Sequence, residues 1–285
     1  MKKGRSADSS GGFTIIEVMV FLIVTGILLI SAIRLLGGQQ ARTAFNQTIR
    51  ESESQFKTTI NEVASGFYPN KGDFNCTVNV SGIPTFSSLG VDNQQGQNED
   101  CIFLGKVVRA GSGGTSYSIH TIVGRRLASG VEVTQLENAR PVPLAAFSGD
   151  PVGTPDATQT IELPSDMQIT KIASVSPTNV VTSIGSFGFL MSLGESVSGD
   201  LVSGAQSINL VPLPGSTLTD SDAQFKAAVA NMAQADIGSA KAIAVCIRLG
   251  GTGGQQGTIV FGSEGRQLST EVIIGAPPSL YGCPA

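Results

Sequence analysis

The stretch "GGFTIIEVMVFLIVTGILLISAIRLL", residues 11–36, decides how the rest of the chain is interpreted. Its last 24 residues, 13–36, contain only two charged side chains, Glu17 and Arg34. At 1.5 Å per residue, a helix over this run is roughly 36 Å long, and the apolar core of a bilayer is about 30 Å thick. The stretch therefore predicts one membrane-spanning helix close to the N-terminus.

Charges before the apolar run indicate its orientation. Lys2, Lys3 and Arg5 outnumber the single acid Asp8, which favours an N-terminus in the cytoplasm and everything after Leu36 outside. A cleaved secretory signal is the alternative for any basic start followed by apolar residues. The fit is poor because the apolar run exceeds the usual length of about 7–15 residues, and "LLGGQQ" is only a weak cleavage site.

The next segment, 37–66, predicts an amphipathic continuation of the helix. Its apolar residues are spaced mostly three or four apart and form one stripe: Phe45, Ile49, Phe56, Ile60, Val63 and Phe67. Gly37 and Gly38 are the expected flexible point, because glycine costs about 1 kcal/mol in a helix interior. Pro69 ends the helical pattern. This second half is expected to pack against a soluble domain.

The remainder, 67–285, has the pattern of antiparallel strands and turns. Short runs rich in Val, Ile, Thr and Phe alternate with Gly, Pro, Asn, Asp and Ser clusters, at 101–110, 117–124, 130–136, 158–164, 167–175, 185–193, 207–213, 241–249, 257–262 and 270–275. One helix is expected within 219–236, capped by Asp220 or Ser221. Segments 82–100 and 138–158 are expected to be long surface loops. The predicted fold class is α+β, with a long N-terminal helix packed on a β-rich globular head.

Composition argues against an electrostatic nucleic-acid binder. The chain of 285 residues has a formal net charge of −4, whereas such a binder needs a basic face. Lys106, Arg109, Arg125 and Arg126 could share a patch if their strands pair, but solvated charges at strand edges are the commoner explanation. DNA capture stays open as an alternative.

The four cysteines suggest disulfides if the body is exported, because such bonds persist in oxidising compartments. Four cysteines allow three connectivities, which the sequence alone cannot decide. Pairing of sequence neighbours is favoured here, Cys76 with Cys101 and Cys246 with Cys283, and free buried thiols are the alternative.

Motifs for catalysis or cofactor binding are not found in the sequence. The glycine clusters at 110–116 and 250–257 lack the Lys-Ser/Thr pair of a phosphate loop, and hairpin turns explain them better. No G-x-S-x-G motif surrounds any serine, and the single histidine, His120, is expected to be an ordinary strand residue. We therefore predict a protein that is not an enzyme, with no catalytic residue, no cofactor and no metal site.

The N-terminal stretch resembles the processing and assembly segment of bacterial type IV pilins and their pseudopilin relatives. A short basic leader, "GG" before an aromatic residue, Thr14, Glu17 and an uninterrupted apolar run coincide. The resemblance covers residues 1–36 firmly and the helix to about residue 65 in outline. It departs from the family in lacking a proline within the membrane helix, where only Gly26 and the 37–38 pair could loosen it.

The resemblance implies roles for three residues. A prepilin peptidase would remove the leader, 1–12, by cutting between Gly12 and Phe13, and the same enzyme would methylate the new amine of Phe13. Glu17 would direct assembly, because a carboxylate in a membrane helix is costly unless it has a partner or a function. Glu17 lies one helical turn from Phe13, so in a filament it could pair with the Phe13 amine of the next subunit and set the register. The alternative is an acid that is simply solvated or protonated at the membrane interface.

These expectations combine into one predicted function, a structural subunit, minor, tip or adhesive, of a type IV pilus-like filament. It would be stored as a single-pass protein of the cytoplasmic membrane and then extend from the cell surface. Its partners would be the prepilin peptidase, other pilin subunits and a membrane assembly platform. The alternatives are a pseudopilin of a secretion or DNA-uptake machine, and a surface binding protein or enzyme that uses the segment only as an anchor.

Overall fold

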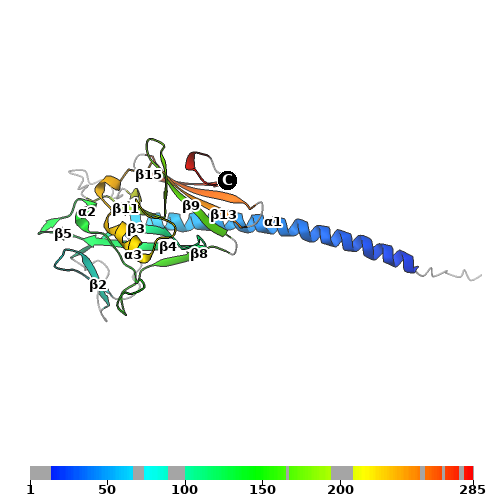
Figure 1. Ribbon diagram of the computed structural model, residues 1–285, viewed down its shortest axis with the longest axis horizontal. Coiled ribbons are helices and arrows are strands. Elements are labelled where there is room, and N and C mark those ends of the chain that lie inside the picture. The colour runs from blue at the N-terminus through cyan, green and yellow to red at the C-terminus, as the bar shows by residue number, and fades with distance from the viewer. Residues whose placement is uncertain are drawn as a thin grey trace, which may run out of the picture. The chain divides into compact units, whose positions relative to one another are not determined.

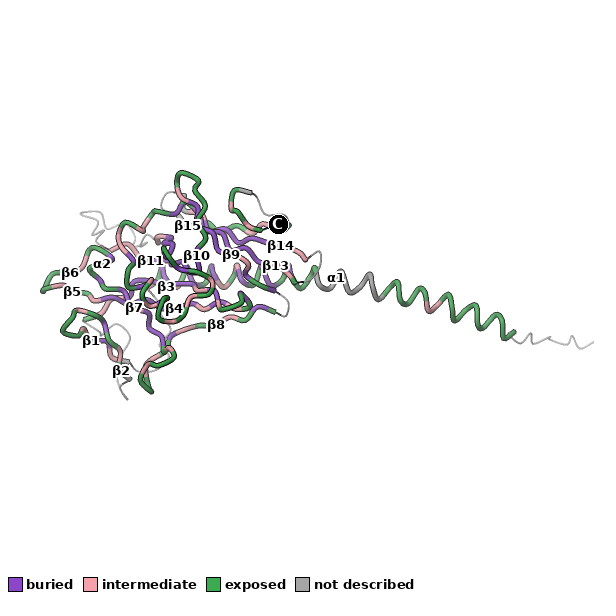
Figure 2. Tube along the Cα trace, in the orientation of Figure 1, coloured by how far each residue is buried: buried purple, intermediate pink, exposed green. Residues whose placement is uncertain are grey.

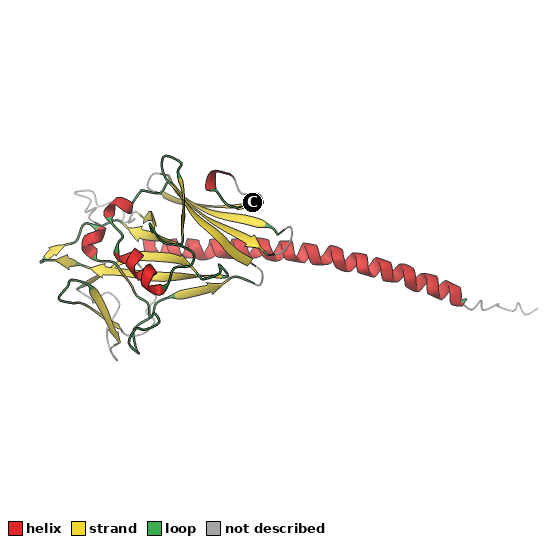
Figure 3. Ribbon diagram, viewed as in Figure 1, coloured by secondary structure: helices red, strands yellow, loops and turns green. Residues whose placement is uncertain are grey.

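The computed structural model describes residues 14–66, 74–88, 100–164, 167–193, 208–250, 254–264, 267–275 and 279–284. The fold is α+β, with an apolar N-terminal helix followed by a β-rich C-terminal region, as the sequence predicts (Figure 3). The chain divides into two compact units, Met1–Ala44 and Phe45–Ala285. Helix α1 (Ile15–Ala64) contributes residues to both.

Two antiparallel sheets form most of the second unit (Figure 1). The first has the order β12-β11-β3-β4-β7, and β8 also pairs with β4. Its strands are β3 (Cys101–Ala110), β4 (Ser116–Arg125), β7 (Val142–Pro143), β8 (Gln159–Glu162), β11 (Ser186–Met191) and β12 (Ile208–Pro212). The second has the order β10-β9-β13-β14-β15, made of β9 (Met167–Val175), β10 (Val181–Ile184), β13 (Ala242–Leu249), β14 (Gln256–Glu264) and β15 (Gln267–Ile274).

Smaller elements complete the described part of this unit. Two short antiparallel pairs join β1 (Phe74–Val78) to β2 (Pro84–Ser88) and β5 (Leu127–Ala128) to β6 (Val131–Glu132). The helices are α2 (Leu136–Ala139) and α3 (Asp222–Ala230), with two short 3-10 turns, η1 (Gln234–Asp236) and η2 (Ser279–Tyr281).

Each of the ten predicted runs contains strand residues, but three of the sequence expectations need correction. The run 130–136 is strand only at Val131–Glu132 and then leads into α2. The expected loop 82–100 contains strand β2, and residues 89–99 lie outside the described part. The expected loop 138–158 contains β7. Periodicity misses β2 because "PTFSS" has a single large apolar residue. The strand forms by antiparallel pairing with β1 in a hairpin closed by the turn at 79–83.

Both sheets pack against the second half of α1. Phe45, Ile49, Phe56 and Val63 of the predicted stripe are at most 1% exposed, and Ile60 packs at the edge of the same cluster. The Phe56 ring lies 5.1 Å, centroid to centroid, from Tyr117 of β4 and 5.1 Å from Phe261 of β14. One side chain of the helix thus contacts strands of both sheets, and burying a Phe side chain is worth about 1.5–3 kcal/mol.

The opposite face of the first sheet is covered by α2 and α3. Phe225 and Val229 of α3 are fully buried there, together with Met232. Ser221 is the N-cap of α3: its side chain accepts from the backbone N–H of Gln224, whose side chain accepts in return from the N–H of Ser221. This capping box selects Ser221 from the two predicted capping residues.

A buried ion pair joins the helix to the first sheet. Lys106 of β3 is only 3% exposed and donates to the carboxylate of Glu62 on α1, which is 26% exposed. Side chains alternate along a strand, so Lys106 faces α1, while Arg109, three residues on, faces α3 and bonds to Asp222 at 2.8 Å. The two cations therefore lie on opposite faces of the sheet.

Candidate functional site

The first half of α1 is an uncovered apolar surface. Residues Ile15–Ala32 have a mean hydropathy of 2.6, and none of them is buried (Figure 2). Large side chains such as Ile15, Ile16 and Phe21 are 82%, 75% and 67% exposed. Eighteen helical residues span roughly 27 Å, close to the thickness of a bilayer core. By length and composition this helix is able to cross a membrane. A secretory signal near the N-terminus would meet the same criteria of length and composition.

The hydroxyl groups of Thr25 and Ser31 in this segment are satisfied by the helix itself. Thr25 Oγ1 donates to the carbonyl of Phe21 at 2.8 Å, and Ser31 Oγ donates to the carbonyl of Ile27 at 2.8 Å. Hydroxyls bonded in this way expose no unpaired donor to a hydrocarbon environment. Apart from Glu17, the described part of the segment is therefore chemically compatible with lipid or with other apolar helices.

Glu17 lies in the first turn of α1, and its side chain is exposed. Thr14 precedes the helix: its Oγ1 accepts from the backbone N–H of Glu17 at 3.3 Å, and its carbonyl accepts from Val18 at 3.2 Å. Thr14 and Glu17 thus have the spacing of a capping box, which the sequence "TIIE" already contains. A carboxylate here also interacts favourably with the helix dipole, by about 0.3–1 kcal/mol at an exposed position. Among the described residues, no ion pair involves Glu17.

The predicted cleavage and methylation residues, Gly12 and Phe13, lie outside the described residues. The predicted pairing of Glu17 with a Phe13 amine therefore stays a prediction.

Two disulfides brace the second unit, and both join cysteines that are neighbours in the sequence. Cys76 of β1 bonds to Cys101 at the start of β3. Cys246 of β13 bonds to Cys283, and the Lys171 amine donates to the nearby carbonyl of Gly282 at 2.8 Å. Such bonds persist in an oxidising compartment, which agrees with export of this unit.

His120 is buried on β4 between two hydroxyl groups. Its Nε2 lies 2.8 Å from Ser118 Oγ and its Nδ1 lies 3.1 Å from Thr158 Oγ1. Burial, and to a smaller extent the positive charge of Arg109, lowers the pKa of His120 to about 4. A neutral imidazole with a hydroxyl, rather than a carboxylate, on its second nitrogen gives Ser118 little activation as a nucleophile. Among the described residues, no cluster of three or more His, Cys, Asp or Glu side chains could hold a metal ion.

The four basic residues that could have formed a nucleic-acid patch are bound within the unit. Lys106 is buried against Glu62, and Arg109 is bonded to Asp222. Arg126 pairs with Glu132 at 3.0 Å, and Arg125 donates from Nε to the carbonyl of Asn138 at 2.6 Å. Lys106 and Arg109 in particular face opposite sides of their sheet, so these two do not combine into one patch.

Comparison of the chain with models of known protein families, with curated proteins and with solved structures finds no match in any of the three.

Proposed function

We propose that this protein is a structural subunit of a type IV pilus-like filament, assembled through the first half of α1. The observation that carries the proposal is an apolar helical segment of 18 residues, none of it buried, with an acid in its first turn. An isolated surface of this kind is unfavourable in water, so it needs lipid before assembly or neighbouring helices afterwards. The resemblance of residues 1–36 to prepilins favours storage in lipid first and packing against the helices of other subunits afterwards.

Glu17 is the residue that this function explains best. A carboxylate at the centre of a membrane helix costs about 2.5–3.5 kcal/mol on insertion scales. The cost is smaller in the first turn, where Glu17 lies, but a charge there is still unfavourable in an apolar bundle unless it has a partner. Cleavage after Gly12 would create an amine on Phe13, and that amine in a neighbouring subunit is a suitable partner. An ion pair in an apolar bundle tolerates little misalignment, which would fix the axial register of the subunits.

Processing is the first test. In cells that process prepilins, mass spectrometry of the mature protein should find an N-terminus at methylated Phe13. A bulky residue in Gly12→Leu should leave the leader attached, because glycine is expected to enter the narrow peptidase cleft. A retained Met1, or cleavage after Leu36, would contradict the proposal and favour a plain anchor or a secretory signal instead.

Assembly is the second test. Glu17→Ala should be cleaved and inserted normally but lost from isolated filaments, whereas Glu51→Ala, at an exposed acid later in the same helix, should assemble as the wild type does. Normal incorporation of Glu17→Ala would remove the charge-pairing argument.

Immunogold labelling of those filaments distinguishes the remaining possibilities. Label along the shaft indicates a major subunit, and label at the end indicates a tip subunit. Processed protein that never leaves the membrane surface would favour a pseudopilin or an anchored surface protein.

A further inference from the structure

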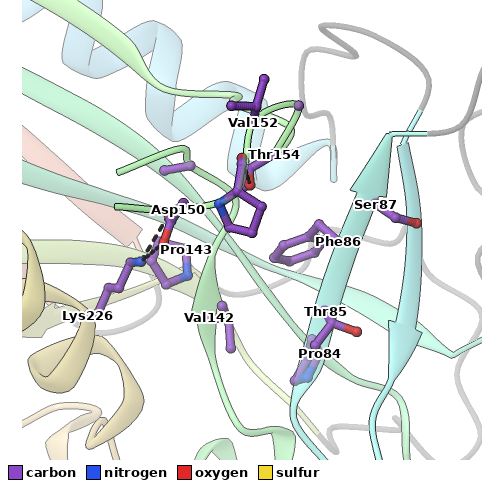
Figure 4. A pocket seen from close by; sticks show the side chains of 13 residues that line it. Pro84, Thr85, Phe86, Ser87, Val142, Pro143, Asp150, Val152, Thr154 and Lys226 are labelled. Carbon is purple, nitrogen blue, oxygen red and sulfur yellow. Dashed lines mark hydrogen bonds and ion pairs between the residues drawn. The ribbon is translucent and has the colours of Figure 1, made fainter. Parts of the chain in front are cut away.

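A cleft with a volume of about 550 Å³ opens between strand β2 and the loop that follows β7 (Figure 4). Its size lies within the range of about 300–1,000 Å³ that is usual for sites that bind small molecules. Both walls belong to the second unit, and Lys226 of α3 closes one side. The lining residues all come after α1 in the chain, so a ligand site here uses no residue of the segment proposed for assembly.

Both walls are held in place by bonds to the rest of the unit. Phe86 of β2 lies directly opposite Cys76 in the β1–β2 ladder, and Cys76 is bonded to Cys101 of β3. The facing loop is pinned where it starts and ends, since Ala157 donates its backbone N–H to the carbonyl of Leu144 at 3.0 Å. Because the walls are already ordered, ligand binding does not carry the entropic cost of ordering them.

More than half of the residues that line the cleft are apolar, and four of these carry rings. Phe86 points from β2 toward the loop that carries Val152 and Thr154, and Pro143 lies below that loop (Figure 4). Pro84 and Pro151 add two further pyrrolidine rings. Flat, rigid C–H surfaces beside an aromatic ring suit a ligand that presents a flat apolar face of its own.

The charges in the lining cancel. Among the described residues that line the cleft, only Asp150 and Lys226 are charged, and Lys226 Nζ lies 2.7 Å and 3.0 Å from the two oxygens of Asp150. The hydrogen bond from Lys226 and the backbone N–H of Phe147 lower the pKa of Asp150, so its carboxylate stays ionised at neutral pH. A charged ligand would meet no net opposite charge here, which favours a neutral one.

This ion pair still has hydrogen-bonding capacity. A carboxylate offers about four acceptor positions and an ammonium three donors. Asp150 uses three positions, two for Lys226 and one for Phe147 N–H at 2.9 Å, and Lys226 uses two of its donors. A donor and an acceptor thus remain side by side at a partly exposed point of the wall, with Lys226 40% and Asp150 22% exposed.

A sugar hydroxyl matches that point, because one oxygen both donates and accepts. A purely apolar ligand would desolvate the ion pair without replacing its bonds to water. A proline-rich peptide supplies carbonyl acceptors but few donors, so it would satisfy Lys226 and leave Asp150 unmatched. We propose that the cleft between β2 and the loop after β7 is a binding site for a neutral saccharide, whose apolar ring face lies on Phe86 and whose hydroxyls bond to Asp150 and Lys226.

The experiment uses the full chain, purified in detergent micelles and applied to a printed array. The array carries neutral oligosaccharides, sialylated and sulfated oligosaccharides, and a peptide of ten prolines. Neutral oligosaccharides are expected to bind. Titration calorimetry with the strongest of them should show roughly tenfold weaker binding for Phe86→Ala and for Lys226→Met, which corresponds to the loss of about 1.4 kcal/mol.

Matched controls separate the site from general damage. Val131→Ala removes an exposed apolar side chain on β6, and Lys57→Met removes an exposed ammonium on α1, and both should bind as the wild type does. Because Phe86 also packs against Cys76, Lys226→Met serves as the test should Phe86→Ala fail to fold. Preference for acidic glycans or for polyproline, absence of any binding, or unchanged affinity in Lys226→Met would each overturn the proposal.

Discussion

The buried ion pair between Glu62 and Lys106 predicts an asymmetric response to mutation. Glu62→Ala leaves an ammonium that is 3% exposed without its carboxylate, and removing one partner of a buried pair costs about 3–5 kcal/mol. Lys106→Met instead leaves a carboxylate that is 26% exposed and can be hydrated, while the Met side chain fills the buried space. We expect this second change to cost less than about 1 kcal/mol.

Helix effects cannot imitate this result. Alanine is a better helix former than glutamate, and Glu62 lies in the last turn of α1, where a negative charge opposes the helix dipole. Both terms favour Glu62→Ala, so any destabilisation comes from lost tertiary contacts, chiefly those of the unpaired lysine. The double variant should recover most of the loss, because it removes both charges.

Differential scanning calorimetry of the full chain in detergent micelles measures the effect. At about 2–4 °C per kcal/mol for a unit of this size, a loss of 3–5 kcal/mol corresponds to a fall in Tm of roughly 6–20 °C. The control is Glu53→Ala, which breaks the 2.7 Å pair with the 54% exposed Lys57 on the same helix and should cost less than about 0.5 kcal/mol. Equal losses for Glu62→Ala and Lys106→Met, or a loss for Glu62→Ala no larger than that of the control, would refute the reasoning.

Three further predictions concern stability. Ser221→Ala should lower the unfolding free energy by about 1 kcal/mol through loss of the α3 cap, and Ser221→Asp, which can also cap, should restore it in the same calorimetric assay. His120 has a pKa of about 4 in the folded protein and 6.5 in the unfolded chain, so the unfolded chain binds more protons between these pH values. Stability should therefore fall by up to about 3 kcal/mol as the pH drops from 6.5 to 4. His120→Gln should reduce the difference in Tm between pH 7.5 and pH 4.5, and an unchanged difference would assign the pH dependence to other groups. Replacing Cys246 and Cys283 together by serine opens a loop of 37 residues and should lower the unfolding free energy by at most about 4 kcal/mol. Any further loss of stability when a reducing agent is added to that variant should come from the Cys76–Cys101 disulfide.

Local patterns predicted most of the elements, though not β2 or β7, and they did not predict the contacts between distant elements. The spacing of Phe45, Ile49, Phe56 and Val63 predicted a buried helical stripe, and all four are buried, because helical periodicity depends only on positions along the chain. The ion pair of Glu62 with Lys106 had no signal, since its members are 44 residues apart and either could have been solvated. The cleft also had no signal, because its walls come from distant parts of the chain and Phe86 lies in a segment that was interpreted as a loop.

By itself, the sequence determined that a short basic stretch precedes an apolar helix, that strands come after it, and that no phosphate-loop or nucleophile-elbow motif is present. These properties result from composition, charge order and short-range spacing. Only the tertiary structure decided which cysteines pair, that both sheets pack the second half of α1, and that Asp150 and Lys226 meet beside Phe86. Those outcomes depend on contacts between distant segments, whose energies are settled by packing in three dimensions and leave no local pattern. For Glu17 the sequence and the structure each contribute. The sequence shows that an acid stands in an apolar helix, where burying its charge is unfavourable, and the structure adds that Thr14 caps the turn in which Glu17 lies.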